Sequence, residues 1–238
     1  MNNQKYYMWL YSVLLISSIS VPLILSFDKK LQFYKQWKHL LPSLFIIAAF
    51  YIICDIYLTN LGVWGFNTRY HSNIIILNLP LEEWLFFIVV PYASIFLHES
   101  IVLYFPGLRL SRRIAKTITI FLIIALAFVV LFNTPKTYTV YIFGVLIFAL
   151  LLSLFDKSEV IRSFFLTFLI ILIPFVIVNA ILTGSFIEEE IVWYNNSENL
   201  GIRFFTIPIE DFGYAFSLIL LNLMLMSQLK HRIKTNQN

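Results

Sequence analysis

The 238-residue sequence predicts an all-α, polytopic membrane bundle of about seven transmembrane helices. Hydrophobic residues make up 60% of the chain and charged residues only 13%, whereas a soluble domain carries roughly 25% charged residues. Apolar runs recur at the length that a bilayer requires, roughly 20 residues. The loops between these runs are alternately poor and rich in basic residues, which is typical of loops on opposite sides of a membrane.

Seven apolar segments qualify, or nearly qualify, as membrane-spanning helices. They cover residues 6–27, 40–58, 81–105, 115–133, 137–155, 162–183 and 209–228. The stretch 115–155 divides at Asn133-Thr134-Pro135-Lys136, because the proline disfavours helix at the residue before it. The first segment is long for a signal-peptide core and lacks a small-x-small cleavage site, so we interpret it as a retained helix.

The basic residues of the loops predict the orientation. The side that holds the N-terminus carries four of them, Lys5, Arg69, Lys136 and Arg203, and the opposite side carries thirteen. By the positive-inside rule the richer side is cytoplasmic, which places the N-terminus outside the cell membrane and the C-terminus inside. Topology thus explains the net charge of +4, and we expect no nucleic-acid partner.

Two parts of the sequence resemble each other. Val63-Trp64-Gly65-Phe66-Asn67 matches Val192-Trp193-Tyr194-Asn195 with one residue dropped, and a proline follows each asparagine by 13 residues. Pro80-Leu81-Glu82-Glu83-Trp84 then matches Pro208-Ile209-Glu210-Asp211-Phe212, at a separation of 128. Several matches in the same order indicate a duplication.

The duplication predicts the division of the chain. We expect a first three-helix repeat over residues 1–105, a linker and connector helix over 106–136, a second repeat over 137–229 and a basic cytoplasmic tail over 230–238. Four helices separate equivalent positions, so the copies have the same orientation and are related by a pseudo-axis along the membrane normal. Both acidic motifs are therefore predicted at one level, on the outer side, where they can converge on one site.

The strongest catalytic candidates are the carboxyl groups of the two motifs, Glu82, Glu83, Glu210 and Asp211. Each pair opens a helix directly after a proline, which is also the ordinary pattern of helix initiation and dipole complementation. Their duplication favours function, because carboxylates at a membrane boundary are costly unless paired, protonated or functional. A carboxyl group in apolar surroundings is harder to ionise, so each pair can supply a proton donor and a base.

A second set of candidates is aromatic and amide side chains around the acids. They are Trp64, Phe66, Asn67 and Trp84 in the first copy and Trp193, Tyr194 and Asn195 in the second. One interpretation is an aromatic belt at the membrane interface. The other is a substrate site in which ring faces stabilise a carbocation by cation–π attraction and the asparagines orient the acids.

Asp55 and its counterpart Asn179 are candidate supporting residues. Asp55 lies near the outer end of the second predicted helix, and an ionisable residue inside a membrane segment is a functional candidate. One expectation is that it orients a neighbouring group or pairs with Arg69 or Arg203, and the alternative is that it serves as a cap or in loop hydrogen bonding. The acidic run 188–190 has no counterpart in the first copy and predicts a solvated face.

The absence of several known motifs argues against some classes of function. The sequence has no Gly-x-Gly-x-x-Gly element and no Walker loop, which argues against nucleotide or flavin binding by those routes. It has no Asp-x-x-x-Asp element to hold magnesium diphosphate, which argues against prenyl transfer. The single cysteine, Cys54, excludes an internal disulfide and a thiolate metal site. We expect neither a cofactor nor a metal.

The motifs resemble those of the small membrane lycopene cyclases of bacteria and archaea, which are related to the cyclase half of the fungal fused cyclase/phytoene synthase. The matching elements are Pro-x-Glu-(Glu/Asp), present at 80–83 and 208–211, and Thr-x-x-Gly-x-Trp-x-(Phe/Tyr)-Asn at 59–67. The resemblance covers nearly all of the chain, and in some relatives the two halves are separate polypeptides. The second copy departs from the first at Asn179, Asp211 and 188–190.

The resemblance implies the reaction. An acid protonates the terminal double bond of a ψ end group of lycopene, the next double bond attacks the cation, and a carboxylate removes a ring proton to give a β-ionone ring. Lycopene would become β-carotene by way of γ-carotene, without redox change or cofactor. The resemblance is compatible with a homo-oligomer or with contacts to other carotenoid enzymes. The sequence leaves open the ring type (β, ε or γ), the number of ends cyclised and which acid donates.

Two other functions are compatible with parts of the sequence. A carotenoid hydratase would use the same acids with water as the final nucleophile. A small transporter can also be built from parallel three-helix repeats, but it requires polar residues near the bilayer midplane. The midplane here is almost wholly Ile, Leu, Phe and Val, with acids at the rim, which favours an enzyme with a lipid-dissolved substrate.

Overall fold

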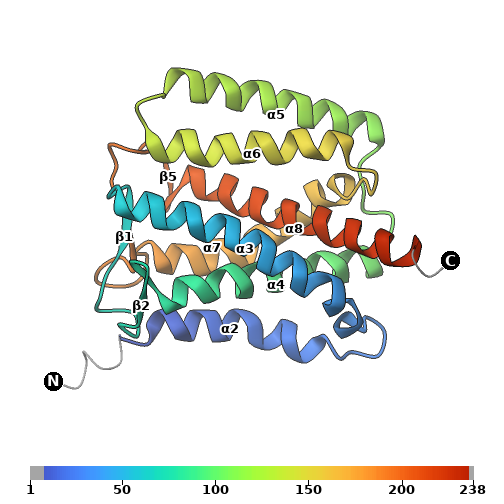
Figure 1. Ribbon diagram of the computed structural model, residues 1–238, viewed down its shortest axis with the longest axis horizontal. Coiled ribbons are helices and arrows are strands. Elements are labelled where there is room, and N and C mark those ends of the chain that lie inside the picture. The colour runs from blue at the N-terminus through green and yellow to red at the C-terminus, as the bar shows by residue number, and fades with distance from the viewer. Residues whose placement is uncertain (1–7, 236–238) are drawn as a thin grey trace.

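The structure is a computed structural model that describes the backbone of residues 8–235 and the side chains of residues 8–231. Within these residues the chain forms seven α-helices that lie side by side (Figure 1). They are α2 (Leu10–Leu25), α3 (Trp37–Asn60), α4 (Leu81–Tyr104), α5 (Arg112–Phe132), α6 (Thr137–Phe155), α7 (Ile161–Leu182) and α8 (Ile209–Thr235). A short 3-10 helix, η1 (Phe33–Gln36), precedes α3. The predicted all-α bundle is confirmed.

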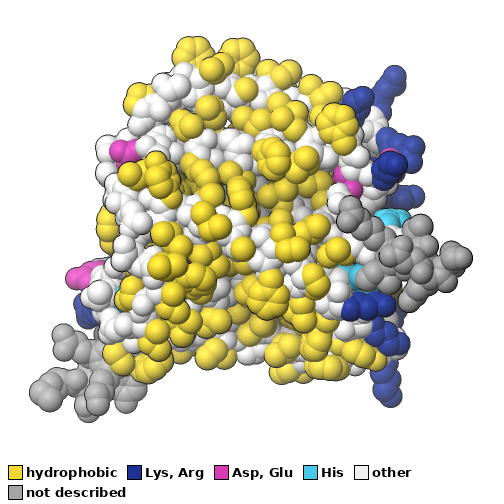
Figure 2. Space-filling view, viewed as in Figure 1, with side chains coloured by type: hydrophobic (Ala, Val, Ile, Leu, Met, Phe, Trp, Pro, Cys, Tyr) yellow, Lys and Arg dark blue, Asp and Glu magenta, His cyan; other side chains and the backbone are white. Residues whose placement is uncertain are grey.

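The helices are those of a multi-pass membrane protein. Six of them are long and apolar enough to cross a bilayer, whereas α2, with 16 residues, is shorter and rises roughly 24 Å. Apolar side chains cover the flank of the bundle, and basic side chains gather at the end where α8 finishes, as the loop charges predicted (Figure 2). Lys5 and the side chains of Arg232 and Lys234 lie outside the described residues.

The two copies interlock around α4 and α8. Helices α2, α3 and α4 have α6, α7 and α8 as counterparts, and the connector α5 packs on the outside of α6 (Figure 1). Helix α2 packs along α4 as α6 packs along α8, within each copy. Helix α3 packs on α4 of its own copy and also on α8 of the other copy, and α7 packs on α4 across the copies. The last helix of each copy, α4 or α8, is therefore covered in part by the other copy.

Three short antiparallel strand pairs, which the sequence did not predict, close one end of the bundle (Figure 1). Strand β1 (Trp64–Phe66) pairs with β4 (Val192–Tyr194) and so joins the long loops of the two copies. Each loop then forms a hairpin, β2 (Ile75–Ile76) with β3 (Leu79–Pro80) and β5 (Arg203–Phe204) with β6 (Ile207–Pro208). Segments of two or three residues are too short to show a strand periodicity.

The hairpins set the level at which the acids enter the bundle. The first residue of α4 donates its N–H to the carbonyl oxygen of Ile74 at 2.8 Å, and the first residue of α8 donates to Ile202 at 3.0 Å. The proline at the end of each hairpin lies directly before the helix, where its fixed φ suits helix initiation. Both acid pairs therefore lie in first turns at the same end of the molecule, as predicted.

Candidate active site

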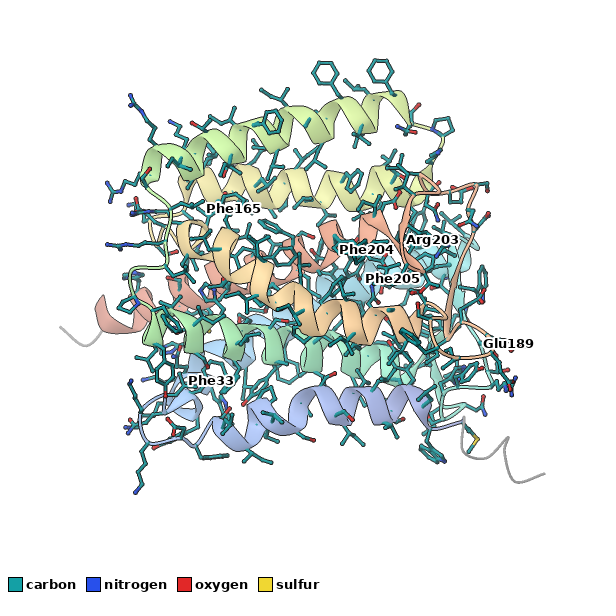
Figure 3. The ribbon with its side chains drawn as sticks, turned by 180° about the vertical axis from the view of Figure 1, so that it is seen from behind. Phe33, Phe165, Glu189, Arg203, Phe204 and Phe205 are labelled. Carbon is teal, nitrogen blue, oxygen red and sulfur yellow. The ribbon has the colours of Figure 1, made fainter. Side chains whose placement is uncertain are left out.

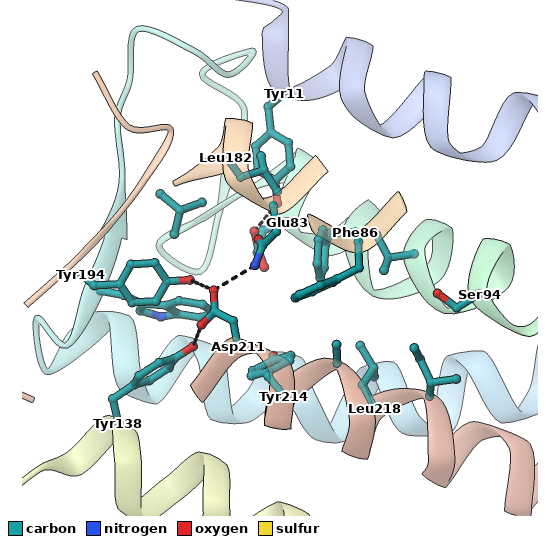
Figure 4. A pocket seen from close by; sticks show the side chains of 17 residues that line it. Tyr11, Glu83, Phe86, Ser94, Tyr138, Leu182, Tyr194, Asp211, Tyr214 and Leu218 are labelled. Atoms are coloured by element: carbon teal, nitrogen blue, oxygen red, sulfur yellow. Dashed lines mark hydrogen bonds between the residues drawn. The ribbon is translucent and has the colours of Figure 1, made fainter. Parts of the chain in front are cut away.

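The second acid of each pair lines a single cavity between the two copies. Glu83 on α4 and Asp211 on α8 both face this cavity of about 50 Å³, and both are buried, with 4% and 5% of their surface exposed (Figure 4). The other walls come from α2, α6, α7, β1 and β4. The duplication has thus produced one central site to which each copy contributes one acid.

The first acid of each pair has a different environment. Glu82 accepts hydrogen bonds from the hydroxyl of Ser12 and the backbone N–H of Ser72, both at 2.8 Å. Glu210 repeats this arrangement with the hydroxyl of Thr139 at 2.6 Å and the backbone N–H of Leu200 at 2.7 Å. Neither of these acids lines the cavity. They tie the long outer loops to the helices.

A tyrosine from the first helix of each copy binds each central acid. The hydroxyl of Tyr11 donates to Oε2 of Glu83 at 2.5 Å, and the hydroxyl of Tyr138 donates to Oδ1 of Asp211 at 2.6 Å. Sequence reasoning missed both tyrosines. The signal was present, because Tyr11 and Tyr138 each precede the hydroxyl residue that binds the first acid, at nearly the repeat separation.

Asp211 receives two further hydrogen bonds, both on Oδ2. The hydroxyl of Tyr194 donates at 2.9 Å and the side-chain amide of Asn179 donates at 3.0 Å (Figure 4). Burial and the adjacent Asp211 raise the pKa of Tyr194 well above its usual range, so its phenol keeps the proton that it donates. Three neutral donors therefore converge on one carboxyl group.

Glu83 has no such set of donors. Among the described residues its Oε1 accepts no hydrogen bond, and Tyr11 is its single donor. The residue that corresponds to Tyr194 in the first copy is Phe66, which has no hydroxyl, and the residue that corresponds to Asn179 is Asp55. The two central acids thus occupy equivalent places in the duplication but differ in their surroundings.

Asp55 does not pair with an arginine, and that prediction is wrong. Its side chain is fully buried on α3 and accepts a hydrogen bond at 3.0 Å from Tyr214, a cavity residue of α8. Arg69 instead forms an ion pair with Glu188 at 2.6 Å, and Arg203 hydrogen bonds within its own hairpin. Asp55 points into the bundle, whereas both arginines lie in the outer loops.

The acidic run of the second copy is exposed, as predicted. The side chains of Glu188 and Glu189 have 63% and 55% of their surface exposed. Both contact Arg69, which belongs to the loop of the first copy. The acidic run therefore adds an outer connection between the two loops, at the rim and away from the cavity (Figure 3 labels Glu189).

The two asparagines do not orient the acids, contrary to expectation. The side-chain amide of Asn67 donates to Glu189 at 2.9 Å, and the side chain of Asn195 accepts hydrogen bonds from Ser197. Their backbone N–H groups flank the β1–β4 pair and donate to Ile191 and Val63, each at 2.9 Å. Asparagine side chains commonly bond to the backbone two residues onward in turns, which explains their matched positions.

Only part of the predicted aromatic set lines the cavity. Trp64 and Tyr194 do, whereas Phe66, Trp84 and Trp193 do not. The indole N–H of Trp84 donates to the backbone oxygen of Ile76 at 3.2 Å, and the ring of Trp193, 38% exposed, lies over Gly65.

The cavity has aromatic walls beside the acids. The ring of Trp64 lies 6.0 Å from that of Tyr138, 5.9 Å from that of Tyr194 and 6.3 Å from that of Tyr214, between centroids. Phe86 and Phe175 complete the aromatic lining, and sequence reasoning missed both, together with Tyr214. Faces of aromatic rings attract a cation, so the site can stabilise positive charge next to two carboxyl groups.

Fold and site together define a duplicated multi-pass membrane protein with an acid pair held in an aromatic cavity between its copies. The family model described as "Lycopene cyclase" matches residues 7–101 and, a second time, residues 135–229. The chain therefore belongs to the lycopene cyclase family, a family of carotenoid-cyclising enzymes. Each match contains one Pro-x-Glu-(Glu/Asp) motif, in agreement with the internal duplication. Neither a curated protein nor a solved structure matches the chain.

Proposed function

We propose that this protein is a lycopene cyclase that converts the ψ end groups of lycopene into β-ionone rings by proton-initiated, non-redox cyclisation. One observation carries the proposal: two buried carboxyl groups, Glu83 and Asp211, reach one aromatic cavity from different copies of the repeat. Membership of the family supports a carotenoid substrate, and the membrane bundle suits a substrate that dissolves in lipid.

The reaction needs one acid and one base. A carboxylic acid transfers its proton to the terminal double bond, and a tertiary cation forms. The electrons of the next double bond close the six-membered ring and move the positive charge onto a ring carbon. A carboxylate then removes a proton from the neighbouring ring carbon, and the electrons of that C–H bond form the ring double bond. One proton enters and one leaves, so the product is an isomer of the substrate.

The aromatic walls lower the cost of the cationic intermediates. The cation forms in a space bordered by Trp64, Tyr138 and Tyr214, whose ring faces provide cation–π attraction. The effect is larger in a dry site than in water, because little solvent screens it. These side chains also exclude water, which would otherwise capture the cation as an alcohol.

Substrate enters from the lipid between α4 and α7. The cavity of about 50 Å³ is smaller than the ~150 Å³ that holds a benzene molecule, so an end group requires movement of the walls. The partly exposed apolar residues of the lining are Phe86 and Val90 on α4 and Phe175 on α7. These two helices therefore border the route along which a polyene end can reach the acids while its remaining chain stays in the bilayer.

The protein functions in the cell membrane with its acidic site at the outer side. The basic side chains gather at the opposite end of the bundle, which the positive-inside rule assigns to the cytoplasm (Figure 2). This orientation places the N-terminus outside and the C-terminus inside. Association with further copies or with other carotenoid enzymes stays a prediction.

The test is expression of the full chain in a lycopene-accumulating bacterium, followed by chromatography and mass spectrometry of the pigments. We expect cyclic products with the mass of lycopene. Glu83→Gln and Asp211→Asn should insert normally and form no β-ionone rings, whereas Glu190→Gln, on the exposed loop, should match the unmodified protein. Unchanged lycopene would contradict the proposal, and a product heavier by one water would identify a hydratase.

A further inference from the structure

We infer that the two central acids have fixed and different roles: Glu83 donates the proton that starts cyclisation, and Asp211 is the carboxylate that removes the ring proton. The inference rests on the proposed function and deepens it. Its basis is the unequal hydrogen bonding of two carboxyl groups that occupy equivalent positions in a duplicated fold.

The surroundings of Asp211 suit an ionised carboxylate. An ionised carboxyl group only accepts hydrogen bonds, and here Tyr138, Tyr194 and Asn179 all donate to its two oxygens. The amide nitrogen of Asn179 cannot accept a proton in return. Hydrogen bonds to a charged acceptor are about twice as strong as those between neutral groups, so this arrangement favours the charged form.

The surroundings of Glu83 suit a neutral carboxylic acid. A single donor, Tyr11, reaches one of its oxygens, and among the described residues nothing donates to the other. A buried carboxylate with one hydrogen bond and apolar walls would be costly, whereas the neutral acid has no charge to solvate. Glu83 lines the cavity, so its proton is available to a polyene end (Figure 4).

The two copies differ at the residues that donate hydrogen bonds to Asp211 but not to Glu83. The tyrosine donors Tyr11 and Tyr138 are common to both copies, as are the hydroxyl and backbone donors to the first acids. Tyr194 and Asn179 are the donors confined to the second copy, because Phe66 and Asp55 occupy the equivalent positions. Asp55 accepts a hydrogen bond from Tyr214 and so offers Glu83 no replacement for the amide.

Each turnover moves one proton between the acids. Glu83 loses a proton to the terminal carbon–carbon double bond and becomes a carboxylate, and Asp211 gains a proton from the ring and becomes an acid. The substrate has gained and lost one proton and is isomerised, with no oxidant or reductant. Before the next cycle, Asp211 releases its proton to solvent and Glu83 takes one up from solvent, so that both acids of the cavity regain their starting states.

Deuterium labelling separates the two roles. The purified full chain is supplied with lycopene in D₂O, and the label is measured by mass spectrometry in the product and in the recovered lycopene. The unmodified protein should place one deuterium in each new ring. Asp211→Asn can still protonate the substrate, so its cations revert or lose a different proton. We expect deuterated lycopene, double-bond isomers or water adducts from this variant.

Glu83→Gln cannot start the reaction and should give neither product nor labelled lycopene. The assignment is overturned if labelled lycopene or misdirected products appear with Glu83→Gln instead of Asp211→Asn, or with neither variant. Failure of the unmodified protein to cyclise lycopene, or to label it, would instead contradict the proposed function. Both substitutions keep the shape of the side chain, and a monodisperse profile in detergent verifies that each variant is folded.

Discussion

Hydrogen-bond donors, at the scale of single residues, separate two acids that the duplication made equivalent. Asp211 accepts from Tyr138, Tyr194 and Asn179, whereas Glu83 accepts from Tyr11 alone among the described residues. Three neutral donors stabilise a negative charge without supplying a counter-charge that would repel the carbocation. The site can therefore hold a base and an acid beside the same cation.

Replacement of Tyr194 by Phe tests whether the hydrogen bond from Tyr194 stabilises Asp211 as the base. Loss of one donor to a charged acceptor costs roughly 1.5–3 kcal/mol, so we expect ring formation to fall by about tenfold or more. Protonation should continue, and in D₂O the ratio of labelled lycopene to cyclic product should rise. A purely structural role for Tyr194 would leave that ratio unchanged.

Tyr11→Phe is the matched control, because it removes the donor to Glu83 instead of one to Asp211. It should lower ring formation without raising the ratio of labelled lycopene to product. An equal rise of the ratio in both variants would contradict the separate support of acid and base.

Glu82 and Glu210 should contribute to stability instead of proton transfer. Each holds a loop through a hydroxyl and a backbone N–H, and each is buried. Replacement of either by Gln should cost about 1–3 kcal/mol of folding free energy, since hydrogen bonds to a charged acceptor become weaker. Thermal unfolding in detergent measures this loss.

The cyclic products of the Glu82 and Glu210 variants, per folded molecule, should keep the wild-type composition. Complete loss of activity in either variant with unchanged thermal stability would place that acid in the chemistry.

At the scale of elements, the β1–β4 pair holds the cavity closed at its outer end. The strands join the loops of the two copies and bring Trp64 and Tyr194, directly paired in the ladder, to the cavity. A Cβ atom at Gly65 would lie 2.3 Å from the ring of Trp193, closer than packed carbon atoms approach. The pair therefore depends on a glycine at this position.

Gly65→Ala should separate β1 from β4 and lower both stability and cyclisation. The added methyl group displaces the ring of Trp193 or the strand itself. Gly144→Ala in α6 is the control, because a Cβ atom there meets nothing within 4 Å and alanine favours helix. Thermal unfolding and pigment analysis measure both effects, and equal behaviour of the two variants would contradict the role of the strand pair.

Most of the helical framework is predictable from sequence because bilayer length imposes long apolar runs. The repeat is predictable as well, since proline, acids and the Trp-containing motif recur at one separation. The strands are not, because two or three residues carry no periodicity. Duplication also brings the acids to one level, but their separation into cavity acids and loop-binding acids depends on hydrogen bonds that only the folded chain shows.

Individual partners were the least predictable feature of the site. Asp55 binds a tyrosine from the other copy, because α3 packs on α8, and sequence proximity to the loops suggested arginines instead. Asn67 and Asn195 recur because both loops turn at the same place, so their repetition reflects backbone geometry. Matched positions in a duplication therefore indicate a shared requirement without distinguishing catalysis from structure.

At the scale of the whole molecule, the interlocked copies make the two halves mutually dependent. Helix α3 packs on α8 and α7 packs on α4, so separation of the halves would expose the packing faces of α4 and α8. The cavity would also lose one of its two acids. One complete site therefore requires both copies.

Chains divided at the α5–α6 loop test this dependence. Residues 1–134 and 135–238, expressed together, should associate and restore cyclisation, whereas neither half alone should form product. Affinity capture through a tag on one half, followed by pigment analysis, measures both properties. Activity in one half by itself would contradict a site shared between the copies.

The central claim is that Glu83 and Asp211 serve one site, and the most direct test is the rate of ring formation by each single variant. A shared acid–base pair predicts that Glu83→Gln and Asp211→Asn each lower the formation of both rings by roughly a hundredfold or more. Two independent sites, one in each copy, would instead leave either variant with about half of the wild-type rate. That result would contradict the account.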